Sequence, residues 1–245
     1  RSSSYVWHWK HVTFHHKYVN IPKYDSDIDM GPIARITPDQ KRYRPHRWQQ
    51  WYLWFLYSLL AVKWQLFDDF ASVITGRVGH HRIPRPRGTD LAVFAGGKAL
   101  FFSLGFIIPL LFRPPLQVLI FYLLTALVAG ITLSLIFILP HTVEQAKFPL
   151  PQPGSTRIGH SRDLHQIRVT ADFARNSRIF TWLVGGLNYH REHHLFPHIC
   201  HVHTPALARI IDEECDRASV PHVEHPSYAA GIASHFRFLR TAGAS

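Results

Sequence analysis

Two groups of histidines stand at the spacing of metal ligands. His190, His193 and His194 form an HxxHH pattern, and positions i, i+3 and i+4 share one face of an α-helix. His11, His15 and a neighbouring His16 form an HxxxHH pattern near the start of the chain. Neutral imidazole binds iron, zinc, copper and nickel. The two groups therefore predict the halves of an all-histidine metal site, although the ligand type alone does not choose the metal.

Other residues are candidates for the same site. His141 directly follows a charge-free apolar segment, where it could be a ligand or a cap at a helix C-terminus. We expect it to be a ligand that links a membrane helix to the metal. His165 could line the site, and Glu144, Asp172 and Glu192 could orient the ligand imidazoles through hydrogen bonds.

The absence of some common metal-binding motifs from the sequence excludes several classes of metal site. Neither HExxH nor HxxEH occurs, which argues against a zinc hydrolase. Cys200 and Cys215 are too few and too isolated for a disulfide framework or a thiolate zinc site. With 19 histidines, some chance clustering on the surface is expected. At least six histidines converging on one site would instead indicate two metal ions, and a histidine-rich iron pair at a membrane suits oxygen activation against an unreactive C–H bond.

The apolar segments determine where these histidines can lie. Residues 48–70 are strongly aromatic, residues 91–112 are apolar around Lys98, and residues 116–139 carry no charge. About 20 apolar residues span a bilayer as a helix. Both histidine groups lie on one side of the membrane only if an even number of spans separates them. We therefore predict spans at 91–112 and 116–139 and an interfacial helix at 48–70, where Trp and Tyr are favoured. Three spans is the alternative.

The predicted fold is all-α, with integral membrane helices and a cytoplasmic helical cap that carries the histidine motifs. Residues 1–47 hold the first motif, and residues 140–245 form the cap with the second. Within the cap we expect a helix over 170–187 and an amphipathic helix over 203–218. The tail after Pro221 is weakly patterned and is predicted to be loosely held.

The net charge and the first residue of the chain indicate the kind of partner and the extent of the sequence. The formal charge is +11, but no nucleic-acid-binding signature accompanies it, so we expect no nucleic-acid partner. The basic stretch from Arg77 to Arg87 suits the cytoplasmic side of a membrane, such as a bacterial inner membrane. The chain begins with Arg1 and its one methionine is Met30, so we expect a fragment whose N-terminal part lies upstream.

These motifs together resemble the membrane fatty acid desaturase family, in its C-terminal part, and most closely the bacterial linoleoyl-CoA or front-end type. His11-Val-Thr-Phe-His15-His16 resembles the family's second histidine box. His141-Thr-Val-Glu144 resembles its additional metal-binding histidine, and the stretch from His190 to Pro197 resembles the third box. The first box is absent from this chain, and we expect it upstream.

The resemblance implies an oxidoreductase of lipid metabolism that introduces a double bond into an acyl-CoA or acyl-lipid. It implies two iron ions, molecular oxygen as co-substrate, and electrons from a ferredoxin or a small b-type cytochrome. The implied iron ligands are His11, His15, His16, His141, His190, His193 and His194. A membrane di-iron hydroxylase or ketolase is the alternative. A metal-binding or transport module is a weaker one, because residues 116–139 hold no metal-binding side chain.

Overall fold

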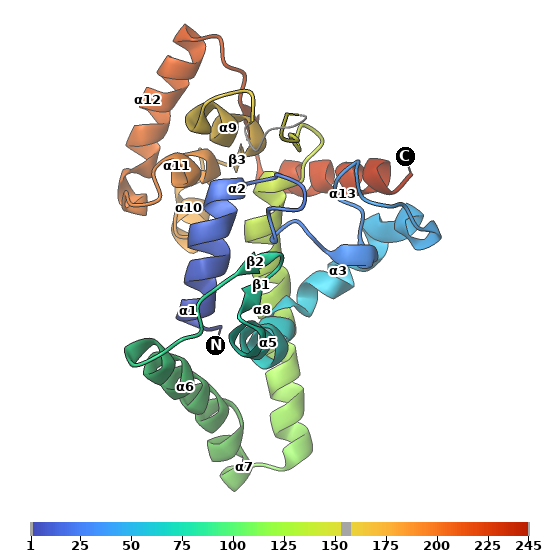
Figure 1. The fold of residues 1–245 in the computed structure, drawn as a ribbon, viewed down its shortest axis with the longest axis vertical. Coiled ribbons are helices and arrows are strands. Elements are labelled where there is room, and N and C mark those ends of the chain that lie inside the picture. Colours follow the sequence, from blue (N-terminus) through green and yellow to red (C-terminus); the bar gives the residue numbers. More distant parts are fainter. Residues whose placement is uncertain (1, 153–157, 245) are drawn as a thin grey trace. The chain divides into compact units, whose positions relative to one another are not determined.

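The computed structural model describes residues 2–152 and 158–244 (Figure 1). The chain divides into two compact units. Unit 1 comprises Arg1–Lys17 and Tyr52–Ser134, and unit 2 comprises Tyr18–Trp51 and Leu135–Ser245. The prediction of a helical fold is confirmed, but it is not strictly all-α, because two small two-stranded sheets accompany the helices.

Unit 1 contains the two long apolar helices. The first runs over Thr89–Phe112 and the second over Pro115–His141, which ends just inside unit 2. Both are long and apolar enough to cross a membrane, at the positions predicted. Only 11% and 17% of their most apolar windows are buried, whereas the core helix of a soluble protein would be mostly buried. Their exposed apolar surface suits lipid.

The remaining helices of unit 1 are short and several are wound as π-helices. The segment predicted as one interfacial helix over 48–70 is divided into consecutive pieces with a π-turn between them. The helical elements are α1 (Ser4–Trp7), η1 (His8–His15), α2 (His16–Tyr18), α3 (Gln49–Ser58), α4 (Leu60–Lys63), η4 (Trp64–Asp68), α5 (Asp69–Thr75), α6 (Thr89–Phe102), η5 (Ser103–Ile107), α7 (Ile108–Phe112) and α8 (Pro115–Ile138).

A small hairpin supports the first helix of unit 1. Strands β1 (Arg77–Val78) and β2 (His81–Arg82) pair antiparallel. Val78 forms a buried cluster with Val6 and Ile83. The Tyr5 hydroxyl donates to the Pro84 carbonyl at 2.6 Å. The hairpin thereby fixes the helix that carries the first histidine motif.

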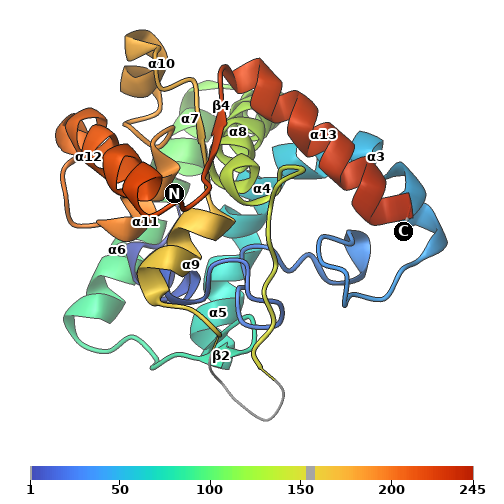
Figure 2. The ribbon, with the colours of Figure 1, turned by 90° about the horizontal axis from the view of Figure 1, so that it is seen from above.

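Unit 2 contains the second histidine motif and the C-terminal region (Figure 2). The remaining 3₁₀ elements, helices and strands are η2 (Gly31–Ile33), η3 (Arg44–Trp48), η6 (Leu139–His141), α9 (Arg162–Val169), β3 (Ala171–Phe173), α10 (Arg178–Leu183), α11 (His190–Leu195), η7 (His201–His203), α12 (Thr204–Arg217), β4 (Val223–His225) and α13 (Tyr228–Ala244). The amphipathic helix predicted over 203–218 is confirmed as α12.

The predicted helix over 170–187 is wrong. Strand β3 begins at Ala171 and pairs in parallel with β4, with Asp172 opposite Glu224. This long-range partner is not visible in a local pattern, and it outweighs helix propensity. Gly185 and Gly186 both have positive φ and end the short helix α10.

The prediction of a loosely held tail is also wrong. Helix α13 packs closely, and its Leu239 and His235 are 0% exposed. A Cβ at Gly231 would lie 2.3 Å from the Phe173 ring, and one at Gly243 would lie 2.0 Å from the His46 carbonyl oxygen. The helix is therefore held through glycines, which contribute no hydrophobic signal to the sequence pattern.

Candidate metal centre

The HxxHH motif of unit 2 lies on helix α11 as the spacing predicts. His190 and His194 are fully buried, and His193 is half-buried. The ring centroid of His193 is 5.6 Å from that of His190 and 5.5 Å from that of His194. The turn η6 at the end of α8 adds His141, whose ring centroid is 4.7 Å from His190 and 5.0 Å from His194. Four of the predicted ligands therefore cluster within this unit.

The ring nitrogens of this cluster stand at distances that suit a shared metal ion. The Nε2 atoms of His190 and His141 are 2.9 Å apart, and those of His194 and His190 are 3.1 Å apart. Two nitrogens each roughly 2.1 Å from one metal, at near-right angles, are about 3.0 Å apart. The donor set thus fits a late first-row transition metal in both type and spacing.

A backbone contact sets the tautomer of His190. Its Nδ1 lies 3.1 Å from the Leu187 carbonyl oxygen. A carbonyl can only accept, so Nδ1 carries the proton and Nε2 carries the lone pair that a metal requires. The ring is therefore held in the protonation state of a ligand.

In unit 1 the HxxxHH motif lies on the π-helix η1 and the start of α2. In an α-helix, position i+5 is about 140° around the axis from position i, so His16 would leave the face of His11. The i→i+5 bonding of a π-helix widens the turn, so positions i+4 and i+5 fall on either side of position i. Accordingly the ring of His11 lies 4.8 Å from His15 and 5.0 Å from His16. The π-helix therefore brings the three predicted ligands together.

A buried ion pair fixes the start of this helix. Lys98 Nζ lies 2.7 Å from the Asp69 carboxylate, and both side chains are almost fully buried. The Ser3 backbone N–H donates to the same carboxylate at 2.6 Å. Further along, the Trp7 ring stacks on His11 with centroids 4.3 Å apart. The charge pair between α5 and α6 thus positions the first turn of the helix that carries His11.

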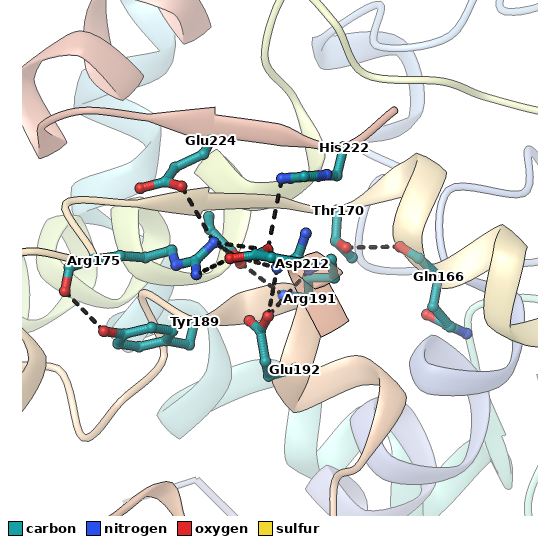
Figure 3. Close-up of polar contacts among 10 residues, drawn as sticks. Gln166, Thr170, Arg175, Tyr189, Arg191, Glu192, Asp212, His222 and Glu224 are labelled. Carbon is teal, nitrogen blue, oxygen red and sulfur yellow. Dashed lines mark hydrogen bonds and ion pairs between the residues drawn. The ribbon is translucent and has the colours of Figure 1, made fainter. Parts of the chain in front are cut away.

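In unit 2 a buried guanidinium holds the helix of the second motif (Figure 3). Arg191 is 1% exposed and lies between three carboxylates. Its Nη2 is 2.7 Å from Glu192 and 3.6 Å from Asp172, and it also bonds to Asp212 on α12. The Asp172 carboxylate accepts the Arg191 backbone N–H at 2.9 Å, in the first turn of α11. This network links α11 to β3 and α12.

Asp172 experiences the strongest electrostatic perturbation of this network. Burial raises the pKa of its carboxyl well above the usual value, and the neighbouring Glu192 charge raises it further. Arg191 and Arg175 oppose both effects. The contacts of Asp172 and Glu192 are thus with arginine, and their expected hydrogen bonds to ligand imidazoles stay a prediction. Glu144, with the same expectation, forms an ion pair with Arg237 at 2.7 Å.

Two further residues hold the backbone around His141, and neither was predicted from the sequence. Asn20 is fully buried with φ of 55°, and its Nδ2 donates to the His141 carbonyl at 2.8 Å. His235 Nδ1 donates to the carbonyl of Thr142 at 2.7 Å. His165 was predicted to line the site, and this stays a prediction. Its Nε2 donates to the Val19 carbonyl at 2.8 Å.

The Asn20 side chain also reaches the carbonyls of Lys147 and Val169, at 3.2 and 3.4 Å. An asparagine four residues after a histidine pair was the available signal, because Asn tolerates positive φ. His235 gave no signal, since it stands alone in a segment of weak pattern. Burial lowers its pKa to about 4.

These features define a class of protein. It is mostly helical, has two helices of membrane-spanning length, and carries histidine motifs with the spacing of metal ligands. The family model for fatty acid desaturases matches residues 1–226. The chain belongs to the fatty acid desaturase family.

Curated relatives agree with this assignment. The chain is similar to the sn-1 linoleoyl-lipid 6-desaturase of Synechocystis sp., with 37% identity covering 98% of this chain and 67% of the relative. It is 33% identical to the enzyme of the same name from Arthrospira platensis, covering 97% of this chain and 64% of the relative. It is 32% identical to the acyl-lipid (8-3)-desaturase of Physcomitrium patens, covering 99% and 51%. The chain thus spans between half and two thirds of these relatives. No solved structure matches it.

Proposed function

We propose that this chain supplies most of the metal-binding residues of a membrane acyl-lipid desaturase, which introduces a double bond into an acyl chain with two irons and molecular oxygen. The observation that supports this most directly is the convergence of the His141, His190 and His194 Nε2 atoms at metal-ligand spacing. Family membership and the names of the relatives favour iron and oxygen chemistry over the other metals that imidazole binds.

We further propose that the histidines of both units ligate one dinuclear centre. The set is His11, His15, His16, His141, His190, His193 and His194, with the remaining ligands outside this chain. Iron ions held there would supply the redox chemistry that removes two hydrogens from adjacent carbons. Imidazole ligands suit this metal, and six of the seven side chains are buried, His193 being half-buried.

The chain's own groups would perform the positioning. The Leu187 carbonyl holds the His190 tautomer, and Asn20 holds the backbone that carries His141. The rigidity of these contacts fixes the ligand geometry, which sets affinity and reactivity at a metal site. We place the centre on the cytoplasmic side of the membrane, and expect a ferredoxin or a small b-type cytochrome as electron donor.

An acyl-lipid, rather than acyl-CoA, is the substrate class that the relatives' names favour. A hydroxylase or ketolase with the same metal site remains the competing activity, because both reactions begin by removing a hydrogen from carbon.

The test uses the full-length protein in lipid nanodiscs. Purified protein is expected to contain two irons per chain and to convert a saturated acyl segment into a product two mass units lighter. The His193→Ala variant should lose iron and turnover. The matched control is His198→Ala, because His198 is exposed and lies just outside the motif. Full iron and normal turnover in His193→Ala would refute the assignment. A product heavier by one oxygen atom would identify a hydroxylase.

A further inference from the structure

Helix α10 presents an unusual apolar surface. It is six residues long, and Ile179, Trp182 and Leu183 on it are 76%, 80% and 66% exposed. Val202 of η7 is 64% exposed, and Ile199 just before η7 is 41% exposed. We call these five residues the α10 patch. Soluble surfaces rarely gather large apolar side chains in this way, so the patch indicates a partner.

The patch is rigidly held and its elements are neighbours. The Asn188 side-chain amide donates to the Thr181 hydroxyl at 2.9 Å, which fixes α10 to the loop before α11. In that loop, a Cβ on Gly186 would lie 2.8 Å from the His201 Cβ, so η7 packs directly against it. The apolar side chains are therefore exposed on elements that are held in place by contacts with their neighbours.

The inner side of α10 connects the patch to the end of the long apolar helix. The Phe180 ring lies 4.8 Å from the Tyr228 ring. Tyr228 packs on the buried cluster that includes Leu139, and Leu135 packs on the same cluster. Both leucines belong to the last turns of the helix Pro115–His141. The patch is thus continuous with the place where a membrane-length helix leaves its apolar stretch.

The charge of the segment suits lipid headgroups. From residue 176 to residue 203 the sequence has one acidic residue, Glu192, and it is 0% exposed. Arg178, His198 and His201 are exposed around the patch. An exposed Trp with an arginine and polar imidazoles nearby is the composition found where a protein enters the headgroup region of a bilayer.

We propose that the α10 patch inserts into the membrane interface and is a lipid-contact surface of unit 2. The proposal depends on membrane insertion of the helix Pro115–His141 and is independent of the oxidation chemistry. A second copy of the chain or a soluble protein would be a different occupant, and the experiment separates these.

The experiment uses the full-length protein in nanodiscs with a Cys200→Ser background, because Cys200 is exposed while Cys215 is buried. A fluorescent NBD label is attached at Trp182→Cys and, separately, at Leu183→Cys in case the first variant does not fold. The matched control is Glu213→Cys on α12, where the neighbours Glu214, Asp216 and Arg217 are charged and exposed.

Labels on α10 should emit at shorter wavelength than the Glu213 label and lose intensity when lipids spin-labelled near the headgroup are added. The Glu213 label should not respond. The proposal would be overturned if the fluorescence intensity of the labels on α10 did not change when spin-labelled lipid was added. The proposal would also be overturned if the emission shift of these labels depended on protein concentration or on an added soluble protein. Either result would identify a protein partner.

Discussion

The HxxxHH motif of unit 1 and the HxxHH motif of unit 2 bring three imidazoles together in different kinds of helix. The spacing on α11 suits an ordinary α-helix, and its neighbours are long-range elements, with His141 arriving from the end of α8. The spacing in unit 1 requires the wider turn of η1. The histidine spacing and the helix type are therefore matched in each motif, and the HxxxHH spacing gives the π-helix a direct geometric reason.

The buried ion pairs that hold the helices of the two motifs differ as well. In unit 1 one lysine neutralises one carboxylate, and that carboxylate also receives a backbone N–H. In unit 2 two guanidinium groups, those of Arg191 and Arg175, share the carboxylates of Asp172 and Asp212, and Arg191 also pairs with the buried Glu192. Arg191 thus faces two almost completely buried carboxylates, whereas Lys98 faces one. We expect the arrangement in unit 2 to be the more sensitive of the two.

The largest effect tests the role of the π-helix. In the full-length protein, His16→Ala should lower metal affinity as much as His15→Ala, by more than roughly 100-fold, since loss of a ligand exceeds loss of a ligand's hydrogen-bond partner. Metal titration and turnover measure this. In an α-helix His16 would face away from His11. A His16→Ala variant with normal iron content would therefore contradict the π-helical explanation.

The second prediction compares the buried ion pairs. Arg191→Met should lower the free energy of unfolding by about 3–5 kcal/mol, because it removes the guanidinium that pairs with the buried Glu192 carboxylate, while Arg175 still pairs with Asp172. Lys98→Met should cost less, because Asp69 keeps the Ser3 N–H. Thermal unfolding in detergent measures which of the two variants is destabilised more. The double variant Lys98→Met, Asp69→Leu should recover most of the loss in unit 1. An equal or larger effect of Lys98→Met than of Arg191→Met would reverse the comparison.

The third prediction concerns acid sensitivity in unit 2. Burial lowers the pKa of His235 to about 4, whereas an unfolded histidine titrates near 6.5. As the pH falls between these values, the unfolded chain binds a proton that the folded chain does not. Stability should therefore decrease by roughly 3 kcal/mol from pH 6.5 to pH 4. The His235→Asn variant keeps a donor near the Thr142 carbonyl but does not titrate. The free energy of unfolding of this variant, measured between pH 6.5 and pH 4, should therefore lack this decrease. An unchanged profile would show that His235 is not the group responsible.

The smallest effect isolates the side chain of Asn20. Asn20→Gly preserves the positive φ and removes the amide, and it should cost about 1–3 kcal/mol from carbonyls left without a donor. Asn20→Ala should cost roughly 1 kcal/mol more through backbone strain. Chemical unfolding of the two variants separates these contributions. Equal stability of Asn20→Gly and the parent chain would mean that the amide contributes nothing to this loop.

Much of the fold was predictable where the signal was local. The apolar runs gave both long helices, the amphipathic pattern gave α12, and histidine spacing gave the residues that cluster within each unit. Long-range contacts could not be predicted in this way. Strand β3 forms because residues 223–225 pair with it, and α13 packs through Gly231 and Gly243. The winding of η1 was likewise hidden, because a helix of eight residues is too short to show a clear hydrophobic period. The joining of both histidine groups at one centre stays a prediction.

The amide of Asn20 has a consequence for biosynthesis. Its three carbonyl acceptors belong to residues 141, 147 and 169, all made more than 100 residues later. During synthesis this loop therefore lacks its partners until both long apolar helices have also been made. The loop that follows the first histidine motif can form its full set of native hydrogen bonds only once residue 169 has been added to the chain.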